Sequence, residues 1–205
     1  MSNPWKEIDL NDYESHMSLD SVYQLQTLNE MMKEQFYSYG IKSIMVLGIA
    51  GGNGLDHIHK DKFEAVYGVD INQDYLEACK KRYPELEGIF HTICADLLSD
   101  SLYLPNSEML IANLLIEYIG YECFQRVVKL VSPQYVSCII QINTDTSFVS
   151  DSPYLHSFDR LEEVHCQLEG EELVGRMQEI GYKMELMKEK KLPNGKKLVR
   201  IDFVG

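Results

Sequence analysis

The chain has 205 residues, enough for one well-buried hydrophobic core but hardly for two. Hydrophobic residues make up 45% of the sequence and charged residues 25%, a composition that is typical of a globular protein and argues against disorder. The formal net charge of −13 repels phosphate backbones, so we expect no nucleic acid partner.

The amino terminus and the cysteines favour a cytoplasmic protein. Residues 1–14 have neither the basic region nor the apolar stretch of a secretory signal, and the longest apolar run, at 109–119, is too short to span a bilayer. The five cysteines are scattered and form no C-x-x-C pair, which suits reduced thiols and provides no zinc site. We therefore expect no membrane association and no bound metal.

The first predicted elements lead to a glycine-rich turn. Apolar residues at three- and four-residue steps predict a helix over 18–38, with Ser21 and Gln24 as a capping box near its start. The apolar run at 42–48 predicts a buried strand. After the glycines, the pattern at 55–63 predicts a brief amphipathic helix.

Strands and helices alternate along the rest of the chain. Further strands are predicted at 64–70, 88–96, 107–116 and 135–143, and further helices at 72–83, 117–130 and 170–180. The runs 182–192 and 196–204 alternate around a Pro-Asn-Gly turn signal, which predicts an antiparallel hairpin. Together these elements predict a single α/β domain with a doubly wound, seven-stranded, mostly parallel sheet, helices on both faces and a C-terminal antiparallel hairpin.

The glycine cluster at 48–54 is the strongest indication of a ligand. Glycine is unfavourable inside strands and helices, so its concentration after the first strand predicts a turn with a ligand against the bare backbone. Doubly wound folds bind ligands at the carboxyl ends of their strands. Asp70 ends the second predicted strand, where a carboxylate accepts two hydrogen bonds from a ribose diol.

Two classes of cofactor fit this pattern. Gly48, Gly52 and Gly54 have the G-x-x-x-G-x-G spacing of short-chain dehydrogenases, which favours an NAD(P)-dependent oxidoreductase. Such an enzyme needs a Tyr-x-x-x-Lys pair to move a proton, and none of the 13 tyrosines is followed by lysine at that spacing.

The second class is S-adenosylmethionine, because four motifs resemble those of the class I S-adenosylmethionine-dependent methyltransferases. The run VLGIAGGNG (46–54) resembles the family's V-L-D-x-G-C-G-x-G, with Gly48 in place of the usual acid and Ala50 in place of the first glycine. VYGVDIN (66–72), CADLL (94–98) and IANLLIEYIG (111–120) resemble the second, third and fourth motifs. The resemblance covers about residues 40–204 and implies a Rossmann-like methyltransferase fold.

The resemblance also implies which residues hold S-adenosylmethionine. Asp70 would bind the ribose, Asp96 and Leu97 the adenine, and Asn113 would lie beside the methyl donor. The full set of candidate cofactor residues is Gly48, Ala50, Gly52, Asn53, Gly54, Asp70, Ile71, Asp96, Leu97 and Asn113.

Methyl transfer from a sulfonium is an in-line displacement, so we expect alignment and exclusion of water rather than a catalytic triad. The candidate catalytic residues are His16 as a base, Asn113, and Glu117 and Tyr118, which follow the fourth strand. His16 is alternatively a packing histidine, and Glu117 and Tyr118 ordinary first-turn helix residues.

Two segments are candidates for closing the site. The resemblance implies that residues 1–39 form a helical lid over an α/β core at 40–205, which would bring Tyr13, His16, Tyr23 and Gln24 near the substrate. The long loop at 143–158 carries Phe148, Tyr154, His156 and Phe158, as an aromatic wall or as anchors of the loop.

The sequence therefore predicts a methyltransferase acting on a small-molecule acceptor. An NAD(P)-dependent oxidoreductase and a non-catalytic binding protein with a degenerate methyltransferase fold remain as alternatives. The oligomeric state is open.

Overall fold

Strands and helices alternate along the chain in this computed structural model, which describes residues 3–143 and 149–205. The strands are β1 (Ser43–Leu47), β2 (Ala65–Asp70), β3 (Phe90–Cys94), β4 (Met109–Asn113), β5 (Tyr135–Ile142), β6 (Lys183–Lys191) and β7 (Lys197–Val204). The α-helices are α1 (Leu10–Ser18), α2 (Gln24–Tyr37), α3 (Gln73–Arg82), α4 (Ile116–Val131) and α5 (Gly170–Glu179).

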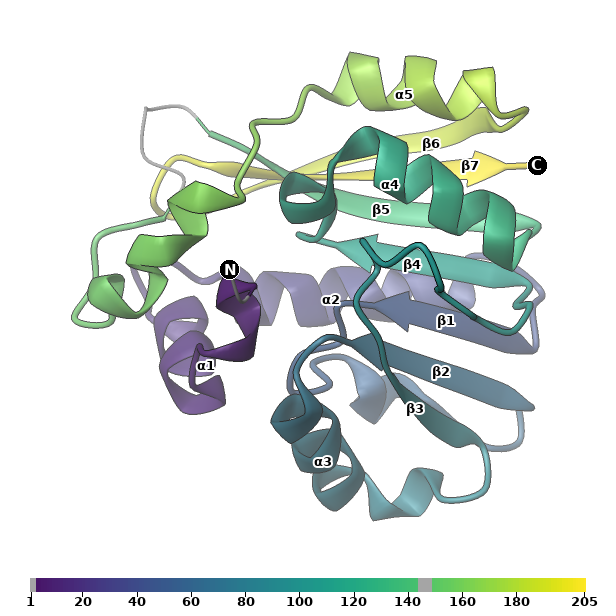
Figure 1. The fold of residues 1–205 in the computed structure, drawn as a ribbon, viewed down its shortest axis with the longest axis horizontal. Coiled ribbons are helices and arrows are strands. Elements are labelled where there is room, and N and C mark those ends of the chain that lie inside the picture. The colour runs from purple at the N-terminus through teal and green to yellow at the C-terminus, as the bar shows by residue number, and fades with distance from the viewer. Residues whose placement is uncertain (1–2, 144–148) are drawn as a thin grey trace.

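The strands form one seven-stranded sheet in the order β3-β2-β1-β4-β5-β7-β6 (Figure 1). Strands β1 to β5 pair in parallel, whereas β7 pairs antiparallel with both β5 and β6. This confirms the predicted mostly parallel sheet with its C-terminal hairpin. The chain builds outward from β1 to β3 and then restarts at β4 on the other side of β1, so β1 and β4 flank the switch point where such sheets bind ligands.

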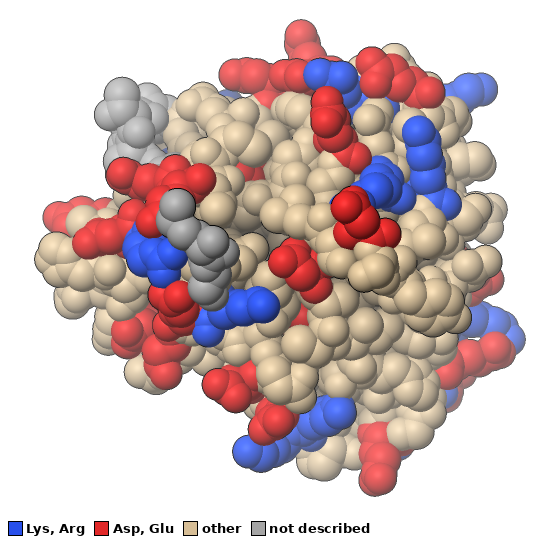
Figure 2. All heavy atoms as spheres, viewed as in Figure 1, with Lys and Arg blue, Asp and Glu red and all other residues tan. Residues whose placement is uncertain are grey.

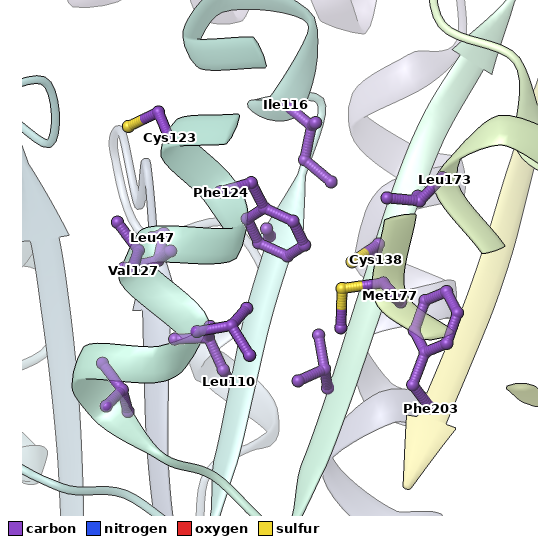
Figure 3. Close-up of a cluster of buried hydrophobic side chains, with 14 of the residues drawn as sticks. Leu47, Leu110, Ile116, Cys123, Phe124, Val127, Cys138, Leu173, Met177 and Phe203 are labelled. Carbon is purple, nitrogen blue, oxygen red and sulfur yellow. The ribbon is translucent and has the colours of Figure 1, made fainter. Parts of the chain in front are cut away.

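Helices cover both faces of the sheet because alternate strand residues point to opposite sides. Met45 and Leu47 of β1 pack with α4 and α5, whereas Ile44 and Val46 pack with α2 and α3. Figure 3 shows the first of these clusters, in which Phe124 of α4 lies against the sheet. Burying each such side chain stabilises the fold by about 1.5–3 kcal/mol.

The helix predicted over 18–38 begins only at Gln24, as α2, because residues 19–23 form a turn; helix α1 (Leu10–Ser18) was not predicted. Leu19 accepts backbone hydrogen bonds from Val22 and Tyr23, which closes the turn, and Tyr23 precedes α2 in a left-handed conformation. The Ser21–Gln24 capping box is therefore wrong, since no side chain caps α2. Helix α2 packs on the sheet through residues such as Met32.

Two other segments differ from the prediction. The amphipathic helix predicted at 55–63 is a single 3₁₀ turn, Leu55–His57, because Ile58 takes an extended conformation. Within the predicted loop at 143–158, a 3₁₀ helix begins at Leu155 and runs to Glu163; we call Leu155–Glu163 the 3₁₀ segment. Its buried residues pack with Ile8 near the amino terminus. Among residues 3–143 and 149–205, no helix combines the length and apolar character needed to cross a membrane.

Candidate active site

A cavity lies at the carboxyl ends of β1, β2 and β4, at the predicted switch point. We call it the strand-end cavity; it encloses about 680 Å³, part of it open to solvent, within the usual range of small-molecule sites. It brings together seven of the predicted cofactor residues: Gly48, Ala50, Asp70, Ile71, Asp96, Leu97 and Asn113.

Asp70 fixes the glycine turn and retains capacity for a ligand. Its Oδ2 accepts the backbone N–H of Ala50 at 2.9 Å and its Oδ1 that of Asn72 at 2.9 Å. Burial raises the pKa of this carboxyl, while the backbone N–H groups lower it in part. A carboxylate offers roughly four acceptor positions, so acceptor capacity remains for a ligand in the cavity that Asp70 lines.

The structure explains why glycine replaces the usual acid at position 48. Gly48 has a φ of +63°, a left-handed conformation that side chains rarely adopt, and an added Cβ would lie 3.0 Å from a methyl carbon of Leu115. Any acid here would be strained and would displace Leu115.

The later glycines accommodate the protein's own helices. A Cβ at Gly52 would lie 2.8 Å from Tyr83, and one at Gly54 would lie 2.9 Å from Met32 of α2. Neither glycine lines the strand-end cavity, and their contact with a ligand stays a prediction. Asn53 lines a neighbouring cavity beside α2, the glycine-loop cavity, and donates a hydrogen bond to the Leu25 carbonyl at 2.9 Å.

Asn113 and Asp96 lie at the ends of the strands as expected, but their partners were not foreseen. The Asn113 amide is held by the buried Gln35 of α2 through two reciprocal hydrogen bonds of 3.0 and 2.9 Å. Asp96 is partly exposed, and its Oδ1 accepts the backbone N–H of Leu98 at 2.9 Å.

A second cavity, of about 540 Å³ including space open to solvent, lies between α1, the start of α4 and the 3₁₀ segment. We call it the aromatic cavity because Trp5, Tyr13, Tyr118 and Phe158 line it. The Trp5 ring meets Tyr13 and Tyr118 edge-on, with centroids 5.8 and 4.9 Å apart. Trp5, Tyr13, Tyr118 and Leu114 line both cavities and so form the wall between them.

Three of the four candidate catalytic residues line the aromatic cavity. His16 is buried, its Nδ1 lies 2.8 Å from Ser152 Oγ, and burial together with Lys196 lowers its pKa. Glu117 is also buried, and burial raises its pKa to about 7. Burial likewise raises the pKa of Tyr118. Asn113 lines the strand-end cavity instead.

The N-terminal segment covers these cavities. In Figure 1, α1 and the 3₁₀ segment lie beyond the carboxyl ends of β1 and β4. Backbone carbonyls of this segment accept hydrogen bonds from Asn72 (to Trp5, 3.1 Å) and Tyr75 (to Ile8, 2.8 Å).

The aromatic residues predicted between 143 and 158 separate in the structure. Phe158 lines the aromatic cavity; Tyr154 packs in the same hydrophobic cluster as Phe158 but does not line the cavity, and His156 is exposed. Phe148 lies outside the described residues. Of the other lid candidates, Gln24 lines the cavity and Tyr23 is largely exposed.

Charge around the site is dispersed. Figure 2 shows basic side chains scattered among acidic ones on one face of the molecule. Within residues 3–143 and 149–205, no three His, Cys, Asp or Glu residues are grouped so as to hold a metal ion.

Comparison with solved structures identifies proteins of the same architecture. N-methyltransferase NodS from Bradyrhizobium japonicum WM9, solved with S-adenosyl-L-homocysteine, has a TM-score of 0.68 and 10% identity, covering 100% of this chain and 99% of that one. The methyltransferase domain of bacterial CtHen1-C has a TM-score of 0.63 and 19% identity, covering 96% and 98%. Magnesium protoporphyrin IX methyltransferase ChlM from Synechocystis PCC 6803, with bound SAH, has a TM-score of 0.63 and 9% identity, covering 98% and 90%.

These proteins share its fold. The chain therefore has the Rossmann-like fold found in class I S-adenosylmethionine-dependent methyltransferases, as the sequence predicts. No protein-family model matches the sequence, and no curated protein matches it.

Four lining or supporting residues were missed by sequence reasoning. Trp5, Gln35, Gln141 and His165 reach the site from separate parts of the chain. Only Trp5 carried a signal, as the single tryptophan in a polar segment.

Proposed function

We propose that the chain is an S-adenosylmethionine-dependent methyltransferase that transfers a methyl group to a small-molecule acceptor by direct in-line displacement. The observation that carries this proposal is the pair of cavities: a strand-end cavity with two carboxylates, joined through a wall of aromatic rings to a second, mostly apolar cavity. One cavity suits a cofactor and the other an acceptor.

The residues present fit the cofactor. Asp70 has acceptor capacity for ribose hydroxyls, and Asp96, which lines the same cavity, would accept from the adenine amino group. The bare backbone around Gly48 and the amide of Asn113 would receive the methionine end. When bound, S-adenosylmethionine supplies an electrophilic methyl group on a positively charged sulfur.

The protein's own contribution is alignment and exclusion of water. The acceptor would enter the aromatic cavity, and the shared wall of Trp5, Tyr13 and Tyr118 would direct its nucleophilic atom toward the strand-end cavity. The N-terminal segment through α1 would serve as the lid, because it lies over the strand ends. Neighbours that bind S-adenosyl-L-homocysteine, such as NodS and ChlM, support the choice of cofactor.

The oxidoreductase alternative loses support from the structure. A dinucleotide pyrophosphate is bound by the N-terminus of an α-helix that follows the glycine turn. Here the turn leads to the 3₁₀ turn Leu55–His57, and Gly52 and Gly54 pack against the protein's own side chains.

A cytoplasmic location stays a prediction.

Titration calorimetry with S-adenosylmethionine, S-adenosylhomocysteine and NAD tests the proposal. We expect both sulfur ligands to bind and NAD to give no heat. Asp96→Ala should weaken S-adenosylhomocysteine binding roughly tenfold by removing a hydrogen-bonded carboxylate. The control is Asp100→Ala, whose side chain is fully exposed. If neither S-adenosylmethionine nor S-adenosylhomocysteine gives heat at millimolar concentration, the proposal is refuted.

A further inference from the structure

The carboxylate of Glu117 is only half satisfied by the protein. Glu117 lies in the first turn of α4 and is 4% exposed. Its Oε1 accepts the backbone N–H of Gln141 at 2.9 Å, while its Oε2 is buried and has no hydrogen-bond partner among the described residues. An unsatisfied buried acceptor is costly, and its persistence at a cavity wall points to a ligand that carries a donor.

Aromatic rings surround the same cavity. Trp5, Tyr13, Tyr118 and Phe158 line it together with Glu117. Ring faces attract a cation within about 6 Å, and a carboxylate supplies the balancing charge. No Lys or Arg belongs to the lining formed by the described residues; Lys196, whose charge lowers the pKa of His16 and His165, is not part of that lining.

We propose that the methyl acceptor is a small amine whose nitrogen binds in the aromatic cavity between the Glu117 carboxylate and the rings. This inference rests on the proposed function and specifies its substrate class. A carboxylate or phosphate acceptor would be repelled by Glu117, and a hydroxyl would donate one hydrogen bond without gaining the attraction between a cation and the rings.

The chemistry balances with Glu117 as the base. An amine enters as the ammonium ion, and the Glu117 carboxylate takes one N–H proton, which frees the nitrogen lone pair. As the new N–C bond forms, the C–S bond breaks and its electron pair stays on sulfur as a thioether. The product leaves as the methylated ammonium ion, and the Glu117 carboxylic acid returns its proton to water.

The other titratable groups around Glu117 are less suited than its carboxylate to accept the proton of the amine. Burial raises the pKa of Glu117 to about 7, within reach of a proton exchange near neutrality. The other titratable groups that line its cavity or interact electrostatically with it are Tyr13, His16, Tyr118, Cys138, His165 and Cys166. Burial raises the pKa of the tyrosines and cysteines, which keeps them protonated, and lowers that of the histidines, which makes them weaker bases than a free imidazole.

Three phenyl compounds with a cationic, a neutral and an anionic head test the inference: 2-phenylethylamine, 2-phenylethanol and phenylacetate. Their binding is measured by calorimetry at pH 8 with the protein saturated in S-adenosylhomocysteine. We expect the amine to bind roughly tenfold more tightly than the alcohol and phenylacetate not to bind. Glu117→Gln should abolish this preference, and Glu122→Gln, an exposed residue of the same helix, should keep it.

The outcomes separate this inference from the proposed function. The inference is overturned if the amine binds no better than the alcohol, which includes the case in which neither binds. It is also overturned if Glu117→Gln keeps the preference for the amine. S-adenosylhomocysteine binding is measured beforehand on the same sample. Its absence refutes the proposed function; the probes are then titrated without it, and the same preference still supports an amine site.

Discussion

Ala50 holds a backbone conformation that suits glycine. Its φ is +47°, and its N–H is fixed by the Asp70 carboxylate. A left-handed conformation costs a non-glycine residue about 1–2 kcal/mol, and substitution by glycine removes this strain. Glycine is also more flexible in the unfolded chain, which lowers the gain in stability by about 0.5–1 kcal/mol. We therefore expect Ala50→Gly to raise the free energy of unfolding by about 1 kcal/mol.

Urea denaturation measures this effect. Ala65→Gly is the matched control, because Ala65 begins strand β2 with an ordinary φ and should lose stability on substitution. A loss of stability in Ala50→Gly as large as in the control would show that the turn is not strained at this residue.

Glu117 makes the stability of the protein depend on pH. Its pKa is raised from 4.5 to about 7 by burial, so the folded state holds a proton that the unfolded state loses between these values. Stability contributed by this group is present at low pH and falls as pH rises toward 7. Glu117→Gln removes the penalty, and its advantage over the wild type should grow from about 1 kcal/mol at pH 5 to about 3 kcal/mol at pH 8.

Free energies of unfolding at pH 5, 6, 7 and 8 test this prediction. Glu122→Gln on the same helix should show no such trend, because Glu122 is exposed. A constant difference between Glu117→Gln and the wild type would mean that Glu117 is ionised throughout the range.

At the scale of elements, an ion pair fastens α1 to α3 across the glycine turn. Arg82 bonds Glu14 through two nitrogens, at 2.6 and 3.0 Å, and donates to the Gly51 carbonyl at 2.8 Å. A Cβ at Gly51 would collide with Glu14, so this glycine makes room for the pair. The pair therefore couples the position of the lid to the shape of the turn.

Loss of this pair should loosen the lid. We expect Arg82→Met to raise the dissociation constant of S-adenosylhomocysteine roughly fivefold, since a partly exposed pair contributes about 1 kcal/mol. Arg176→Met, which breaks an exposed pair on α5, should leave the affinity unchanged. Equal affinity in the two variants would mean that α1 does not depend on Arg82 for its position.

The elements themselves were largely predictable, and the reasons are local. Buried parallel strands are continuous apolar runs, and the Pro-Asn-Gly turn marks the hairpin from β6 to β7. The prediction started α2 too early, at residue 18, because apolar residues keep their helical spacing through the turn that Leu19 closes. The 3₁₀ segment was missed because its packing partners, such as Ile8, are distant from it in the sequence.

The candidate site was predictable only where a residue ends a strand. Asp70 and Asn113 were located by position, because the carboxyl ends of parallel strands meet at one edge. The Gln35 amide that holds Asn113 and the Trp5 ring that divides the cavities depend on long-range packing, which no local pattern encodes. For Gly52 and Gly54 the sequence could not separate two causes, since close packing against a side chain demands glycine as strictly as a ligand does.

At the scale of the whole molecule, the sheet, the amino-terminal segment and the 3₁₀ segment together make the site. The sheet delivers Asp70 and Asn113 to the switch point, while the amino-terminal segment and the 3₁₀ segment close over it and create the aromatic cavity. The excess of acidic residues makes the surface attractive to cations, in keeping with an amine acceptor.

A crystal structure of the protein with S-adenosylhomocysteine tests the central claim most directly. We predict the ligand in the strand-end cavity, with its ribose hydroxyls hydrogen-bonded to Asp70, its adenine beside Asp96 and Leu97, and its sulfur toward the ring wall of Tyr13 and Tyr118. A ligand bound elsewhere, or in this cavity with no contact to Asp70, would contradict the account.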